Sequence, residues 1–239
     1  MPEDLDDNQE LWRYFKLENF LSTIEDRQVY FASANMFSDP FEGAIAVIPP
    51  EYKPDPRFSL QNSFDDSFKA LTELVKISCW HIENFESNAM WKLYANDNKG
   101  IAITSNVKKL KASLKPFRLG APYGEERPHF GKVVYKDLST EIVSTDSIER
   151  FFFKHKAFAW EKEYRVVISL RLASELGVEL PEKGVLVDTD IDELISAIFL
   201  GPSLNQNEKE QVLSIASKYG LQDRIKNSSM LGTPKYWIK

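Results

Sequence analysis

Short apolar runs of strand length, bounded by turn residues, recur along this whole chain. They predict strands at 11–15, 28–33, 75–80, 100–104, 130–135, 164–170, 184–187, 195–200 and 224–226. Helical periodicity predicts helices at 17–25, 60–74, 87–95, 106–115, 147–159 and 205–219, the last ended by Gly220. Strands are too numerous for a simple alternation with helices, so we expect an α+β fold with a mixed or split β-sheet and flanking helices.

The length of the chain favours one folding unit, because 239 residues can bury a single core comfortably. Residues 1–10 (MPEDLDDNQE) are predicted to form an acidic, flexible N-terminus, and residues 11–239 a single domain. The proline-rich segment at 49–58 is predicted to be an extended connector inside that domain.

Charge and composition narrow the class of protein. A net charge of -6 disfavours generic binding to a phosphate backbone, although a local basic groove would still be compatible with nucleic acid. The apolar runs are far shorter than a membrane span, and the N-terminus is acidic where a signal peptide is basic and then apolar. We therefore expect a cytoplasmic protein without a membrane partner. One cysteine and three scattered histidines make no internal disulfide and no zinc pattern, so no metal is expected.

A pair of glutamates stands where a predicted aromatic helix runs into a predicted strand, in the stretch FKHKAFAWEKEYRVVISLR at 153–171. Glu161 and Glu163 point the same way if the chain between them is extended. A carboxylate pair at the mouth of a strand can stabilise a developing cation or move a proton. Lys162 and Arg165 offer the alternative interpretation, a solvated ladder of ion pairs.

Four segments follow one another between residues 11 and 202: LWRYFKLENFLSTIEDRQVYFASANMFSDPFEG, ISCWHIENFESNAMWKLYANDNKGIAI, FKHKAFAWEKEYRVV and ISAIFLGP. In their order and spacing they resemble the bacterial DUF2971 family, a domain family of undefined function. The resemblance implies a single DUF2971-like domain over 11–239 with an ADP-ribosyltransferase-like fold. A fold by itself does not establish an activity.

The ADP-ribosyltransferase pattern implies three catalytic positions on separate strands. Arg13 takes the first and would bind the phosphates and ribose of NAD through its planar guanidinium. Ser78 takes the second and Glu163 the third, while Glu161 completes a Glu-x-Glu pair and would orient or deprotonate the acceptor. Two positions depart from the pattern, because Ser78 does not open a Ser-Thr-Ser run and Arg13 stands where many DUF2971-like sequences have histidine.

Two hypotheses from different classes follow. The first is an enzyme that acts on NAD or a related nucleotide and either transfers ADP-ribose to an unidentified acceptor or hydrolyses the nucleotide, as a toxin or phage-defence effector would. The second is a non-catalytic module of the same fold that holds a ligand or a partner protein in an aromatic cleft, with Trp80, Trp91, Tyr94 and Trp160. A metal-dependent nuclease that uses Glu161, Glu163 and Asp39 is a more distant third.

Structural roles compete with functional ones for several candidates. Trp91 and Tyr94 would contact the nucleotide in the enzyme hypothesis, but their spacing of three residues is also typical of a helix face in the core. Ser78 can bond to the backbone as a buried hydroxyl. Asp39 and Glu42, in the SDPFEG loop, can serve the shape of the turn alone.

Overall fold

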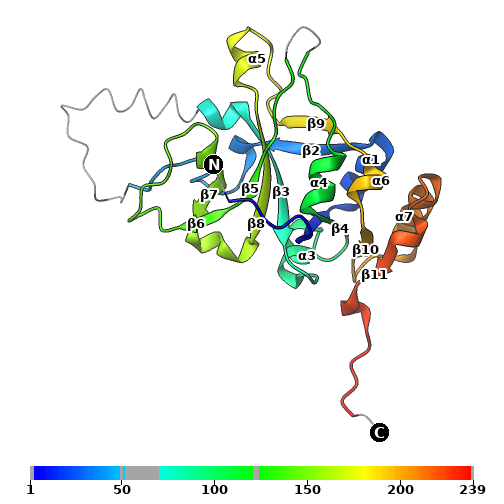
Figure 1. Ribbon diagram of the computed structural model, residues 1–239. Helices are drawn as coiled ribbons and strands as arrows, with labels where there is room; N and C mark the ends of the chain where they lie inside the picture. The colour runs from blue at the N-terminus through cyan, green and yellow to red at the C-terminus, as the bar shows by residue number, and fades with distance from the viewer. Residues whose placement is uncertain (1–2, 49–50, 52–69, 121–123, 238–239) are drawn as a thin grey trace, which may run out of the picture. The chain divides into compact units, whose positions relative to one another are not determined.

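A computed structural model describes residues 3–48, 51, 70–120 and 124–237 of the chain (Figure 1). This part of the chain divides into two compact units, each assembled from three separate segments. Unit 1 consists of Met1–Asp6, Val29–His81 and Lys115–Asp188, and unit 2 of Asp7–Gln28, Ile82–Leu114 and Thr189–Lys239. The predicted connector at 49–58, apart from residue 51, and the predicted helix at 60–74, apart from the helical residues 70–74, lie outside the described residues.

Unit 1 is built on a largely antiparallel sheet. Its strands pair in the order β2 (Gln28–Ser33), β3 (Val75–Ile82), β8 (Glu163–Ser169) and β5 (His129–Lys132), and β9 (Gly184–Asp188) lies beside β2. The strands β3 and β8 are buried over almost their whole length, although both carry polar side chains, among them Lys76, Glu163 and Arg165. A separate parallel pair is formed by β6 (Val134–Lys136) and β7 (Phe153–His155), and the short helix α5 (Arg171–Glu175) follows β8.

Unit 2 carries a mixed sheet. β1 (Glu10–Phe15) pairs antiparallel with β4 (Ile101–Asn106), β4 pairs antiparallel with β10 (Ala197–Leu200), and β10 pairs parallel with β11 (Ile225–Asn227). The helices of this unit are α1 (Leu17–Asp26), α3 (Asn88–Tyr94), α4 (Val107–Ser113), α6 (Ile191–Leu194) and α7 (Gln206–Lys218). α1 packs against α7, α4 against α6, and α3 against β1 (Figure 1).

Polar side chains fix where three of these helices begin. Ser87, Asn106 and Asn205 each accept the backbone N–H of the residue three positions later, so one otherwise unsatisfied N–H at each helix start is paired. At α7 the side chain of Glu208 also accepts the N–H of Asn205, which completes a capping box. The predicted starts of the helices at 87, 106 and 205 are therefore confirmed.

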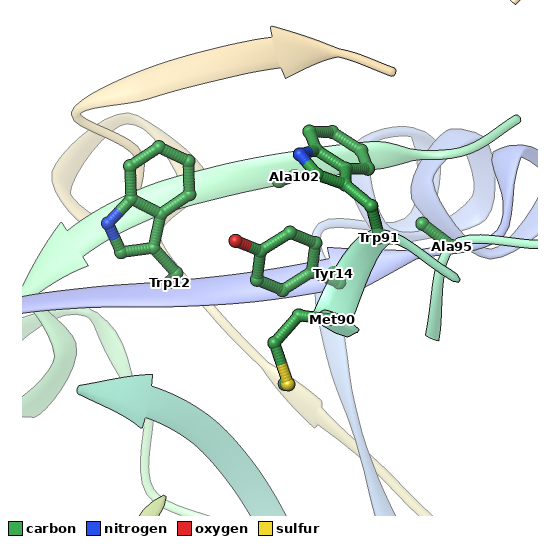
Figure 2. Packing of buried hydrophobic residues seen from close by; sticks show 6 residues of the cluster. All are labelled: Trp12, Tyr14, Met90, Trp91, Ala95 and Ala102. Atoms are coloured by element: carbon green, nitrogen blue, oxygen red, sulfur yellow. The ribbon is translucent and has the colours of Figure 1, made fainter. Parts of the chain in front are cut away.

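The core of unit 2 is aromatic. Figure 2 shows the ring of Tyr14 between the indoles of Trp12 and Trp91, with Met90, Ala95 and Ala102 beside them. The Tyr14 and Trp91 rings meet edge to face with centroids 5.1 Å apart, a favoured arrangement for aromatic pairs. The cluster holds α3 against β1 and β4, because its members come from these three elements.

The structure confirms the expected α+β class with a mixed sheet and flanking helices, and two predicted elements are corrected. The predicted helix at 147–159 is wrong: the chain forms 3₁₀ turns at Glu149–Phe152 and Lys156–Glu161, separated by β7. Phe151 and Phe152 are both fully buried, and consecutive residues of an α-helix do not share one face. The predicted strand at 130–135 is divided into β5 and β6 by Val133, whose N–H donates to the carbonyl of Glu163. None of the described helices is long and apolar enough to cross a membrane.

Candidate functional site

The two glutamates singled out by the sequence meet in unit 1, although the chain between them is not extended. Glu161 ends a 3₁₀ turn, Lys162 adopts a left-handed conformation with φ of 44°, and Glu163 begins β8. The Lys162 N–H closes the turn by donating to the carbonyl of Ala159. The tight left-handed turn, rather than strand alternation, therefore brings the two side chains to one place.

A buried lysine joins the two carboxylates. Lys154, on β7, donates to Glu161 Oε2 and, over 2.8 Å, to Glu163 Oε1. The three side chains are only 5–7% exposed, so the alternative interpretation as a solvated ladder of ion pairs is wrong for this pair. The ammonium of Lys154 also lies 4.7 Å from the ring centre of Phe158, a cation–π contact that further replaces the water lost on burial.

Arg165, two residues along β8 and completely buried, pairs with two carboxylates at once. Its Nε donates to Glu163 Oε2 over 2.7 Å, and its two terminal nitrogens form a fork with both oxygens of Glu42 at 2.6 and 3.0 Å. The remaining N–H groups donate to the carbonyl of Phe151 and to Glu163 Oε1. All five donors of the guanidinium are thereby satisfied, which is the condition for burying this cation at tolerable cost.

The cluster holds one more carboxyl group than cations, which favours uptake of a proton by one of these carboxyl groups. Among the described residues the cluster joins three carboxylates, Glu42, Glu161 and Glu163, to two cations, Lys154 and Arg165. Burial, together with the hydrogen bond to Glu163 and its charge, raises the pKa of Glu161 to about 7. Burial alone would also raise the pKa of Glu163, but Arg165, the hydrogen bond from Glu161 and Lys154 together hold that pKa well below its usual range. Glu161 is therefore the member of the glutamate pair that binds a proton more readily, and burial also raises the pKa of Glu42.

The register of β3 against β8 identifies the other side chains on this face of the sheet. His81 pairs with Glu163 and Cys79 with Arg165, and directly paired residues share a face. Ser78 pairs with Val166, so alternation along the strand places it on the opposite face from Glu163. The sheet thus brings His81 and Cys79 to the cluster, and Ser78 is not among the residues that face it.

Two neighbours fix the backbone around the pair. His81 donates from Nδ1 to the carbonyl of Glu161 over 2.6 Å, because a carbonyl can only accept. Tyr135 accepts the N–H of Glu163 at its hydroxyl over 2.8 Å. Burial raises the pKa of the Tyr135 hydroxyl and, with the charge of Glu163, that of the Cys79 thiol, so both groups stay neutral. Neutral groups around the pair add no further charge to it.

The candidates predicted to bind a nucleotide belong to unit 2. Arg13 lies on β1 with its guanidinium 5.3 Å from the ring centre of Phe15. Trp91 has no exposed surface, and its indole N–H donates to Glu86 over 2.9 Å, so its place is in the aromatic core. Tyr94, at the end of α3, is 45% exposed and is the accessible aromatic of the two.

The glutamate pair is matched to cations and not gathered for a metal. Over the described ranges, no group of three or more His, Cys, Asp or Glu side chains is arranged to hold a metal ion. Glu161 and Glu163 face Lys154 and Arg165 instead. The structure therefore gives no support to the nuclease alternative.

Sequence reasoning misses most partners of the glutamate pair. Glu42 is 123 residues from Arg165 along the chain, and no local pattern links them. Lys154 falls in a predicted helix that does not form, which hides its position opposite the pair. The sequence does offer a way to predict Arg165 as a partner. It lies two residues after Glu163, so both side chains point to the same face of a strand, and the residues after it are apolar.

The fold and the site define an α+β protein with a buried pair of carboxyl groups whose pKa values are shifted in opposite directions. Residues 90–166 match the model of a family described as "Protein of unknown function (DUF2971)". This match supports the resemblance seen in the sequence, and it covers most of α3, all of β4 and the run from Lys154 to Arg165. No curated protein and no solved structure matches the chain. The ADP-ribosyltransferase-like fold stays a prediction.

Proposed function

We propose that the chain is an enzyme in which Glu161 transfers a proton and NAD or a related nucleotide is the substrate. The observation that carries the proposal is the opposite shift of two neighbouring carboxyl groups, because the pKa of Glu161 is raised by burial and that of Glu163 is held low by its cations against the effect of burial. Environments that separate the pKa values of a pair are characteristic of acid–base catalysis. A group with a pKa near 7 is present in both forms at neutral pH, as a general base requires.

The proposed reaction is a displacement at C1′ of the nicotinamide ribose. Water or an acceptor hydroxyl or amine attacks C1′, the bond to nicotinamide breaks, and nicotinamide leaves with the bonding electrons. The ionised form of Glu161 takes the proton that the nucleophile loses. Glu163 stays ionised because Arg165 and Lys154 hold it, so it supplies fixed negative charge as positive charge develops on the ribose.

NAD enters this proposal through the resemblance to the ADP-ribosyltransferase pattern. The roles predicted for Arg13 and Tyr94 in holding the nucleotide stay predictions, and Trp91, which has no exposed surface, is not proposed to contact it. Of these, Arg13 is the most direct to test, because its planar fork suits phosphate oxygens. Arg13→Gln should weaken NAD binding in calorimetry about tenfold or more, as loss of a charge-assisted hydrogen bond does.

The decisive experiment follows nicotinamide release from NAD by the whole chain and by Glu161→Gln. The variant should lower the rate roughly 100-fold or more, the usual contribution of a general base. Glu175→Gln is the matched control, because Glu175 is an exposed glutamate of the same unit, paired with Arg171 on the surface, and its rate should be unchanged. Turnover that survives in Glu161→Gln would remove the role given to Glu161.

The pH dependence of the rate gives a second readout. A general base must be ionised, so kcat/KM should rise as the pH passes through about 7 and then level off. This limb should be missing from the residual activity of Glu161→Gln. A rate that falls as the pH rises through this range would instead assign Glu161 as a general acid.

A non-catalytic binding module is the second candidate, and one observation favours it. Both oxygens of Glu163 are occupied by Lys154 and Arg165, which leaves this carboxylate engaged in holding the fold. In that case NAD or another ligand would bind in calorimetry without release of nicotinamide. Absence of both binding and turnover would overturn the NAD proposal.

A further inference from the structure

A cavity of about 400 Å³ lies in unit 1 beside the SDPFEG loop. Its volume falls in the range of sites that hold small organic molecules. Small and apolar groups make up part of its wall, and the polar members come from the loop and from elements around it. The lining includes Ala34, Phe37, Asp39, Glu42, Gly43 and Ala44.

One carboxylate in the wall is incompletely paired. Asp39 is 4% exposed, and its Oδ1 accepts the N–H of Phe41 over 2.9 Å in the turn of the loop. Its Oδ2 is buried, and no hydrogen-bond donor among the described residues reaches it. A buried carboxylate oxygen without a donor is costly, so the position calls for a donor supplied from the cavity.

The loop that carries Asp39 is held in shape without a ligand. Gly43 has a φ of +73°, and a Cβ there would lie 2.6 Å from the ring of Phe151, so the close approach of loop and ring requires glycine. Backbone hydrogen bonds join Ile45 to Val143 and Val47 to Leu138, so a distant segment of the chain at 138–143 holds the end of the loop. The wall is therefore preformed, and Asp39 is not free to turn away from the cavity.

We infer that this cavity binds a small organic cation, an amine or amidine with an apolar body, whose N–H groups donate to Asp39 Oδ2. An ionised donor is favoured over a neutral one, because charge-assisted hydrogen bonds are stronger and a cation also compensates the buried charge. Glu42, the second carboxylate of the wall, is already forked with Arg165, so Asp39 is the anchor. Phe37 and the alanines offer the apolar body its contacts.

Binding in this cavity does not require the proposed enzyme activity. The cavity and the glutamate pair share one residue, Glu42. Glu42 lines the cavity and also pairs with Arg165, which in turn holds Glu163. A ligand can therefore occupy the cavity whether or not the chain cleaves NAD. The two proposals fail separately, since the binding experiments for the cavity contain no nucleotide.

The test compares three probes of similar shape and different charge: benzamidine, benzamide and benzoate. Titration of the whole chain, followed by NMR, should give the affinity order benzamidine, then benzamide, then benzoate. Asp39→Asn removes the charge and puts an amide N–H donor where Oδ2 accepts, so it should lower the affinity for benzamidine about tenfold or more and that for benzamide, whose carbonyl oxygen can accept from this donor, by less. Asp223→Asn, at an exposed aspartate of unit 2, should change neither. No binding of benzamidine, or equal binding by Asp39→Asn, would overturn the inference.

A second variant separates the cavity from the charge. Ala44→Leu keeps Asp39 and fills part of the space, so it should weaken the binding of benzamidine and benzamide alike.

Thermal unfolding without ligand adds a third readout. Asp39→Asn should have an unchanged or higher Tm, because a neutral amide group replaces an unpaired, charged oxygen while Oδ1 can still accept from Phe41. A variant that unfolds, or melts several degrees lower, would mean that Oδ2 already has a partner and would overturn the inference.

Discussion

Each unit buries a large cluster of side chains, and the two clusters have opposite chemistry. In unit 2 the centre consists of aromatic rings from Trp12, Tyr14 and Trp91 that pack against each other. In unit 1 it includes a cluster of five buried charged side chains, here called the charge cluster: Glu42, Lys154, Glu161, Glu163 and Arg165. Aromatic packing is a sum of many small contacts, whereas the charge cluster depends on every charge having its partner.

This difference teaches how each centre responds to the loss of one member. A ring that is shortened leaves a gap, and its neighbours keep favourable surroundings. A cation that is removed from the charge cluster leaves carboxylates buried without compensation, which costs more than the pair contributed. The charge cluster is thus the more fragile of the two, and this fits a region kept for function rather than for stability alone.

The largest expected effect comes from Arg165→Met. The substitution keeps much of the side-chain volume but strands Glu42 and Glu163, so we expect a loss of about 3–5 kcal/mol in the free energy of unfolding. Urea denaturation followed by circular dichroism measures it. Arg171→Met is the control, because its pair with Glu175 is exposed, and the change there should stay within about 0.5 kcal/mol.

If Arg165→Met and Arg171→Met cost the same stability, the charge cluster would not be the fragile centre that distinguishes unit 1 from unit 2. Equal losses would mean that the stranded carboxylates are compensated cheaply, by water or by uptake of a proton, and that the charge cluster does not depend on Arg165. Failure of Arg165→Met to fold would also indicate a large loss of stability, provided that Arg171→Met folds normally.

Much of the fold can be predicted because it is encoded locally. The strand predicted at 28–33 is found with the same bounds in β2, and the caps of α3, α4 and α7 are visible in the sequence as Ser or Asn before helical periodicity. The helices α5 and α6 are not predicted, because five and four residues are too few to show a period. Local sequence patterns thus predict the longer helices and strands but not the shortest helices.

The candidate site can be predicted only in part. Glu161 and Glu163 are recognisable from their spacing, but the physical reason is different, since a left-handed Lys162 and not an extended chain brings them together. The predicted Ser78 lies one residue from Cys79, and a shift of one residue along a strand changes the face. The contact from Glu42 to Arg165 spans 123 of the 239 residues and follows from tertiary packing, which no local pattern encodes.

A smaller effect is expected from Glu161→Gln, and it depends on pH. The pKa of Glu161 is about 7 in the folded chain, above its ordinary value of 4.5, so its stabilising contribution is complete below about pH 4.5 and is lost as the pH rises to about 7. The wild type should lose on the order of 2 kcal/mol over this range. Glutamine does not titrate, so the variant should lose less stability than the wild type over this range when both are measured by urea denaturation at several pH values. The remaining loss is that of Glu42, whose pKa burial also raises.

Glu163 provides the internal check on this prediction. Its pKa is held low in the folded chain, since Arg165 and Lys154 outweigh the effect of burial, so its contribution is present above about pH 4.5 and is lost as the pH falls further. That acid limb should persist in Glu161→Gln. Loss of the acid limb together with the neutral one would show that the two carboxyl groups cannot be assigned separately.

The smallest expected effect lies in the aromatic centre of unit 2, with Tyr14→Phe. The ring keeps its place between Trp12 and Trp91, but the N–H of Ser87 loses the hydroxyl that accepts it over 2.9 Å. We expect a loss of about 1 kcal/mol in urea denaturation, the usual cost of one partly buried hydrogen bond. Tyr30→Phe, which removes an exposed hydroxyl bonded to the carbonyl of Lys183, should cost less. A loss from Tyr14→Phe as large as that from Arg165→Met would mean that unit 2 also depends on a polar network, because the aromatic contacts are unchanged in this variant.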